Sequence, residues 1–135
     1  MWTYLSIDWG SKKTGFALGN PELRLVIPKD KVTLTGQAMN YIEDLVKKNP
    51  IKVIIIGLPL TLSLTRTATT ESVEQFSIKL SSLYPMLTII HYNERGSSKV
   101  TAQKLRDKGL DNRKVRNYDS LAASEILQNY FREIL

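Results

Sequence analysis

Hydrophobic and polar residues alternate along the start of the chain in the pattern of short, paired strands. Residues 2–8 place apolar or β-branched side chains on one side and polar ones on the other, which predicts a strand that ends at Asp8. Residues 14–18 and 23–27 predict two further strands, and Pro28 closes the last of them. Because glycine-containing turns separate these segments, we expect an antiparallel meander.

The pattern then changes twice. From about residue 35 to residue 48 the hydrophobic period is helical, and Asn49-Pro50 ends the predicted helix. Residues 52–57 form a continuous apolar run rich in β-branched side chains, which predicts a central strand covered on both faces. A loop rich in Thr, Ser and Leu follows, from residue 58 to residue 69.

The second half of the chain predicts one more strand and three more helices. A helix carries apolar residues from Val73 to Tyr84, and a strand follows at 87–92. A third helix stops at Gly109, and a last one covers about 118–133. The order β-β-β-α-β-α-β-α-α predicts an α/β fold in which a five-stranded mixed sheet has helices on both faces, in one domain spanning residues 1–135.

Composition removes several classes of protein from consideration. The 135 residues include no cysteine, which excludes disulfides, thiolate metal sites and cysteine nucleophiles, and fits a reducing cytosol. No apolar run approaches the roughly 20 residues that a membrane span requires. No signal peptide is apparent at the N-terminus. We therefore expect a cytoplasmic protein with no membrane partner.

The excess of positive over negative charge lies in one stretch of the chain. Residues 95–116 carry eight basic and two acidic residues, so this stretch alone accounts for the net charge of +6. A basic patch of this kind is typical of a surface that binds a polyanion such as nucleic acid, although a solvated basic face without a ligand has the same composition. The basic residues are Arg95, Lys99, Lys104, Arg106, Lys108, Arg113, Lys114 and Arg116.

Three acidic residues stand where predicted elements begin or end. Asp8 and Glu94 each lie just beyond an apolar strand, where side chains of neighbouring strands can converge. Asp119 opens the last helix and shares a face with the apolar residues three, four, seven and eight positions further on. A carboxylate directed at a sheet is costly unless a cation or a cap hydrogen bond compensates it. An Asx-turn at Asp8 and an N-cap at Asp119 are the structural alternatives.

The types of these residues suggest a particular chemistry. Three carboxylates without a Cys or His ligand nearby suit Mg²⁺ or Mn²⁺ rather than zinc. Two such ions about 4 Å apart can activate a water and stabilise the leaving oxygen in phosphodiester hydrolysis. His91 lies within a strand pattern and is interpreted as a structural or surface residue. Trp2 and Trp9 are interpreted as core or rim residues rather than as platforms for base stacking.

Four motifs in this order resemble the YqgF family (also called RuvX) of Holliday junction resolvases, within the RNase H-like superfamily. The first is Ile7-Asp8-Trp9-Gly10-Ser11-Lys12-Lys13-Thr14-Gly15, in which Trp9 stands where the family usually has Pro. The others are Ile55-Ile56-Gly57-Leu58-Pro59-Leu60, Asn93-Glu94-Arg95 and Tyr118-Asp119-Ser120-Leu121-Ala122-Ala123. The resemblance extends over essentially the whole chain. Asn93 replaces an Asp, and the loop at 61–69 differs from the family's pattern.

The resemblance implies an RNase H-like fold with Asp8, Glu94 and Asp119 as an acidic triad that holds metal ions. It also implies a nuclease that acts on structured nucleic acid, either at the 5′ end of pre-16S rRNA or on Holliday junctions. The resemblance is compatible with ribosome association, and with either a monomer or a homodimer. We expect these basic residues to contact nucleic acid: Lys12, Lys13, Arg66, Arg95, Lys99, Arg113, Lys114 and Arg116.

Two other functions use the same features. A nucleic-acid-binding protein with little cleavage activity would need the basic stretch but not the metal, so a metal titration distinguishes it from a nuclease. Sugar kinases and actin-like ATPases also begin with an Asp-x-Gly turn. They need a second phosphate loop and a second domain to enclose ATP, and this chain shows neither.

Overall fold

The N-terminal strands pair as the alternation of their residues requires. The computed structural model describes residues 1–9, 13–29, 33–59, 68–94 and 118–134. Strands β1 (Tyr4–Asp8), β2 (Lys13–Asn20) and β3 (Leu25–Pro28) form an antiparallel meander. Its register sets Tyr4 opposite Gly19, and Asp8 opposite Gly15.

Two parallel strands extend the sheet on the other side of β1. Strand β5 (Val53–Pro59) pairs with β1, and β6 (Thr88–Glu94) pairs with β5. The order is β3-β2-β1-β5-β6, and a two-residue strand, β4 (Thr33–Leu34), also pairs with β2. Parallel neighbours require crossover connections, which helices provide here. The predicted five-stranded mixed sheet is therefore confirmed, with β4 as a short addition.

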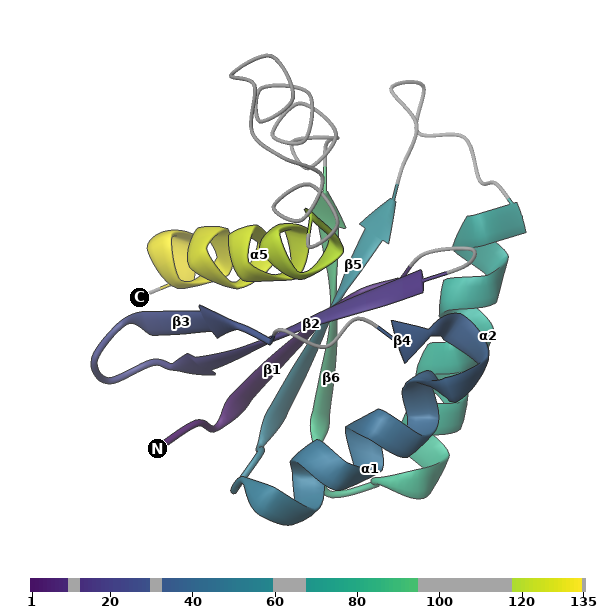
Figure 1. The fold of residues 1–135 in the computed structure, drawn as a ribbon, viewed down its shortest axis with the longest axis horizontal. Helices are drawn as coiled ribbons and strands as arrows, with labels where there is room; N and C mark the ends of the chain where they lie inside the picture. Colours follow the sequence, from purple (N-terminus) through teal and green to yellow (C-terminus); the bar gives the residue numbers. More distant parts are fainter. Residues whose placement is uncertain (10–12, 30–32, 60–67, 95–117, 135) are drawn as a thin grey trace.

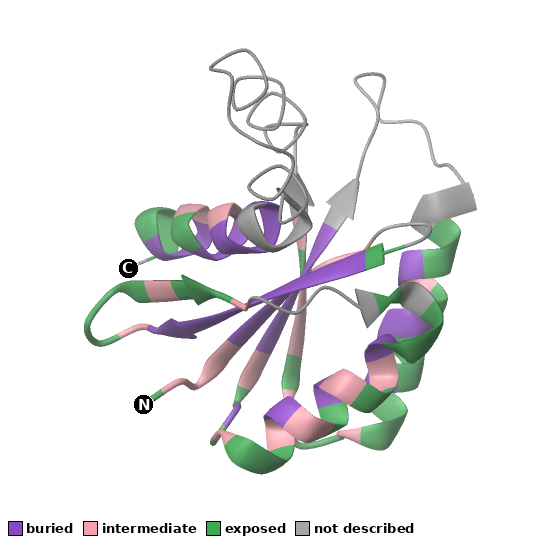
Figure 2. Ribbon diagram, viewed as in Figure 1, coloured by how far each residue is buried: buried purple, intermediate pink, exposed green. Residues whose placement is uncertain are grey.

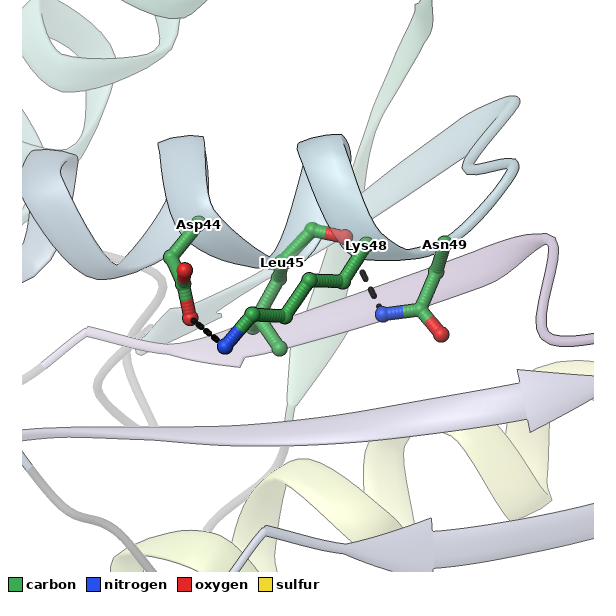
Figure 3. A network of polar contacts seen from close by, with 4 residues as sticks. All are labelled: Asp44, Leu45, Lys48 and Asn49. Carbon is green, nitrogen blue, oxygen red and sulfur yellow. Dashed lines mark hydrogen bonds and ion pairs between the residues drawn. The ribbon is translucent and has the colours of Figure 1, made fainter.

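The first crossover helix ends at Lys48, directly before Asn49-Pro50, as its sequence predicts. A 3₁₀ turn, η1 (Thr35–Gln37), leads into α1 (Ala38–Lys48). At its C-terminus the side-chain amide of Asn49 donates a hydrogen bond of 3.0 Å to the carbonyl of Leu45 (Figure 3). On the outer surface Lys48 pairs with Asp44 at 3.1 Å, an exposed contact that adds little stability (Figure 3).

Helices cover both faces of the sheet (Figure 1). Helices α1 and α2 (Ala68–Leu83) pack on one face, and α5 (Tyr118–Ile134) packs on the other. Figure 2 shows the buried positions on β2 and on the side of α5 that faces the sheet. Within the described residues, no helix has both the length and the apolar character that a membrane crossing needs.

The third strand begins two residues later than its sequence predicts. The side-chain oxygen of Asn20 accepts hydrogen bonds from the backbone N–H groups of Glu22 and Leu23, which lengthens the turn. Arg24 then adopts a left-handed φ of 53°, and β3 starts only after it. Pro28 belongs to β3 instead of closing it, because a proline is tolerated on an edge strand.

The parallel strands run further than their sequences predict. The pairing of β5 with β6 continues through Leu58 with Asn93 and Pro59 with Glu94. Glu94 is therefore the last residue of a strand and does not lie beyond one. The last helix agrees with its prediction to within one residue. The predicted third helix, ending at Gly109, lies outside the described residues.

Candidate active site

Asp8 lies on the face of the sheet that α5 covers. Side chains at alternate positions of β1 share a face, and two of them contact this helix. The ring of Tyr4 meets Phe131 edge to face, with centroids 5.2 Å apart. The hydroxyl of Ser6 donates a hydrogen bond of 2.6 Å to the carbonyl of Ala123. Asp8 is the next residue of this row, and it is partly exposed at the end of the strand.

Position 119 lies at the same end of the sheet. The contacts of Tyr4 and Ser6 show that α5 runs in the direction opposite to β1. From Ser6 to Asp8 the strand advances about 6.6 Å. From Ala123 back to Asp119 the helix retreats about 6 Å. The backbone positions of Asp8 and Asp119 therefore lie at nearly the same distance from the hydrogen bond that joins Ser6 to Ala123. The face that position 119 shares is buried on the sheet, as predicted, at Ala122, Ala123, Ile126 and Leu127.

Glu94 reaches this end through the parallel strands. The register sets Asp8 beside Gly57 and Gly57 beside Tyr92, and Glu94 is two residues further along β6. With strands about 4.8 Å apart and a rise of about 3.3 Å per residue, the Cα atoms of Asp8 and Glu94 are about 12 Å apart. The fold therefore brings the backbone of all three predicted acidic positions to one end of the sheet.

Glycine flanks Asp8 on both neighbouring strands. Gly15 of β2 and Gly57 of β5 are its partners in the register, so neither strand places a side chain beside the carboxylate. Glycines at such positions let a cation or phosphate approach the backbone closely. This pair was not predicted from the sequence. Its only signal was that each glycine interrupts an otherwise apolar strand.

Trp9, the residue after Asp8, packs on the opposite face of the sheet. Its ring lies 4.0 Å from that of Phe76, centroid to centroid, at an interplanar angle of 30°. Its indole N–H donates a hydrogen bond of 3.2 Å to the hydroxyl of Ser72. Trp9 thus ties the end of β1 to α2. It packs at the rim of the core, as its sequence context predicts.

The remaining predicted residues divide between the described and undescribed parts of the chain. Lys13 is exposed at the start of β2, two residues before the glycine that pairs with Asp8. His91 is exposed on β6 with its Nε2 atom 2.7 Å from the hydroxyl of Ser77, consistent with a surface role. The other predicted nucleic-acid contacts lie outside the described residues: Lys12, Arg66, Arg95, Lys99, Arg113, Lys114 and Arg116.

Three tyrosine rings gather between α5 and the sheet and affect the pKa of one of them. Tyr130 lies between Tyr4 and Tyr92, with ring centroids 6.1 and 6.4 Å away. Burial, with a smaller contribution from Tyr4, raises the pKa of Tyr130 above its usual value. A tyrosine hydroxyl is protonated at neutral pH even without this shift, so the surface between α5 and the sheet carries no charge at this position.

The mixed sheet with helices on both faces defines an α/β fold of the RNase H-like type. A solved structure of fowlpox virus resolvase with Holliday junction DNA has the same fold, with a TM-score of 0.55 and 14% identity over 98% of each chain. The family model described as "RuvX: Holliday junction resolvase" matches residues 2–133. The chain belongs to this nuclease family.

Relatives from several bacteria cover nearly all of the chain. A protein of Orientia tsutsugamushi (strain Ikeda) is 37% identical over 133 residues, covering 96% of this chain and 83% of its own length. One from Rickettsia canadensis (strain McKiel) is 33% identical and covers 96% and 86%. One from Porphyromonas gingivalis is 28% identical and covers 93% of each. All three bear the name "Putative pre-16S rRNA nuclease".

Proposed function

We propose that residues 1–135 form one metal-dependent endonuclease domain, in which Asp8, Glu94 and Asp119 hold Mg²⁺ or Mn²⁺. The observation that carries the proposal is the position of Asp8. It ends a strand on the face under α5, it has a glycine on each side, and the backbone positions of both other acids lie at the same end of the sheet.

The chain's own groups fit hard cations. Carboxylate oxygens are the ligands that Mg²⁺ and Mn²⁺ prefer, and the three positions include no sulfur or imidazole ligand. When bound, a pair of such ions supplies an activated water and stabilises the leaving oxygen. Lys13 lies close enough to this end of the sheet to attract a phosphate. The N-terminus of α5 favours negative charge at the same place.

The proposed substrate is structured nucleic acid, with the 5′ end of pre-16S rRNA as the first candidate. The names of the bacterial relatives support this choice. A Holliday junction is the second candidate, supported by the family description and by the fowlpox virus resolvase complex. Processing of an rRNA end would take place in the cytoplasm, on or near a ribosomal particle. Resolution of a junction requires two symmetric cuts, which would favour a homodimer.

The first experiment replaces the central carboxylate. Asp8→Asn keeps the size of the side chain but removes its charge, so we expect Mn²⁺- or Mg²⁺-dependent cleavage to fall by about a hundredfold or more. The thermal unfolding midpoint and the affinity for nucleic acid should remain near those of the wild type. The matched control is Asp44→Asn, a half-exposed Asp on α1 whose partner is Lys48 (Figure 3). Equal cleavage by wild type and Asp8→Asn would show that the assignment is wrong.

The second experiment chooses between substrates. Wild-type protein is incubated with a pre-16S rRNA fragment and with a four-way DNA junction, each with and without Mn²⁺. Cleavage of the RNA alone supports rRNA processing, and paired symmetric cuts in the junction support resolution. Tight, salt-sensitive binding of either substrate without metal-dependent cleavage would instead indicate a binding protein.

A further inference from the structure

A hollow lies between the C-terminal half of α5 and the hairpin of β2 and β3, away from the acidic positions. Its volume is about 280 Å³, and it is lined by Arg24, Val26, Gln128, Phe131 and Arg132. That volume is slightly below the range of about 300–1,000 Å³ that is usual for small-ligand sites, which suits a single nucleotide unit better than a large ligand.

The local structure explains why these residues meet. The turn that Asn20 stabilises places Arg24 directly before β3, with a left-handed φ of 53°. Gly19 lets α5 approach β2 closely, because a Cβ atom there would lie 2.9 Å from Cζ of Phe131. Phe131 is consequently buried and provides an apolar floor, while both arginines remain exposed. The hollow is thus produced by the close packing of the helix on the sheet.

The chemistry of the lining favours an anion attached to a flat apolar group. Guanidinium groups bind phosphate oxygens in a planar, often bidentate geometry, and arginine also stacks on bases. Gln128 adds an amide, and the floor is formed by Val26 and Phe131. A carboxylate close to Arg132 in sequence is occupied elsewhere, because Glu133 accepts a hydrogen bond of 2.8 Å from the hydroxyl of Tyr92.

The position of the hollow relates it to the candidate active site. Residues 128 and 132 follow Asp119 by nine and thirteen helical positions, about 14 to 20 Å along α5. A duplex covers this distance in about four to six base steps. We propose that the hollow is a second nucleic-acid site, which binds a phosphate and its nucleoside in the flank of the substrate. This proposal rests on the proposed nuclease function, because that function supplies the nucleic acid.

The test compares a variant that lacks both arginines of the hollow with a matched control variant. Arg24→Asn tolerates the left-handed backbone, and Arg132→Gln keeps the helix, so the double variant should fold normally. The control, Lys52→Gln with Lys79→Gln, also removes two exposed positive charges, but from other parts of the surface. Circular dichroism melts verify that both double variants are folded.

Binding is measured by fluorescence anisotropy with labelled RNA hairpins and, in parallel, DNA hairpins, whose stems are about 4 or about 12 base pairs long. Asp8→Asn provides the background, so that no probe is cut. We expect the Arg24/Arg132 variant to bind the long stems about tenfold more weakly, with the salt slope reduced by up to about 2, and to bind the short stems normally. The control should bind every probe as the background does.

Two outcomes overturn the inference. One is unchanged binding of the long stems by the Arg24/Arg132 variant, and the other is equal weakening for short stems and for the control. Failure of the nuclease proposal is recognised separately, in the protein with Asp8 intact. If that protein shows no metal-dependent cleavage while the length-dependent loss of binding persists, the hollow is still a nucleic-acid site and only the nuclease assignment is wrong.

Discussion

The two faces of the sheet differ in polarity, and the alternate residues of β1 show the difference. On the face under α1 and α2, Leu5 and Ile7 are fully buried in the larger apolar cluster of the described residues. On the face under α5, the alternate positions of the same strand are Tyr4, Ser6 and Asp8. One face is thus an ordinary core, and the other becomes polar toward the end where the acidic positions lie.

The contrast has a simple physical origin. Two helices supply apolar side chains to the first face, so the apolar residues of the central strands there are buried at a gain in free energy. Among the described elements only α5 covers the second face, and its buried cluster is small. Polar groups are tolerated where this helix begins, because the end of the strand is partly open to solvent. The fold can therefore carry reactive groups on one face while the other maintains its stability.

The largest expected effect comes from neighbouring isoleucines on opposite faces of β5. Ile56 belongs to the larger cluster and Ile55 to the smaller one, and both are fully buried. We expect Ile56→Ala to lower the free energy of unfolding by about 4 kcal/mol and Ile55→Ala by about 2 kcal/mol, because a single helix can settle into a cavity more easily. Urea unfolding measures both. Equal losses would remove the proposed difference between the faces.

The contact of α5 with β2 is sensitive to added volume. A Cβ atom at Gly19 would lie 2.6 Å from Cδ2 of Leu127, which is buried and has little room to move. Gly19→Ala should therefore destabilise the protein by about 1–3 kcal/mol in thermal or urea unfolding. Gly36→Ala is the control, since nothing lies within 4 Å of its Cβ position. A neutral Gly19→Ala would mean that α5 is held less tightly than the contacts indicate.

The hydrogen bond from Ser6 to Ala123 connects the two sides of the candidate active site. Ser6→Ala should cost about 1 kcal/mol in unfolding, because a single neutral hydrogen bond is lost. Cleavage should fall by about tenfold, which is more than this stability loss explains, because the start of α5 is then less firmly positioned. Ser82→Ala, at an exposed position on α2, should change neither quantity. Unaltered cleavage in Ser6→Ala would show that the bond has no positioning role.

The smallest effect is expected at the hydrogen bond between Trp9 and Ser72 of α2. Ser72→Ala removes the acceptor of the Trp9 indole N–H but leaves the ring on Phe76. Because the bond is exposed, we expect a loss of at most about 0.5–1 kcal/mol, with a change in tryptophan fluorescence emission. Trp2 provides a constant background in that measurement. A loss well above this range would mean that the Trp9 bond matters more than its exposure suggests.

Much of the fold was predictable, because strand and helix periods are local properties. The alternation in residues 2–8, the β-branched run before Gly57 and the apolar face of the last helix each identified an element. The limits of β3 were not predictable from the same pattern. They depend on the side chain of Asn20, which caps the turn, and on a proline that is acceptable only because β3 is an edge strand.

The candidate site shows the same division. The sequence by itself determined which acids come at the ends of strands and helices, since an interruption of the hydrophobic period is visible locally. Only the tertiary structure decided that Gly15 and Gly57 flank Asp8, because that depends on the register of three strands. Tertiary structure also placed Arg24 and Arg132, which are more than a hundred residues apart in the chain, on the lining of one hollow. Periodicity reports which face a side chain occupies, whereas its neighbours on that face are set by long-range pairing and packing.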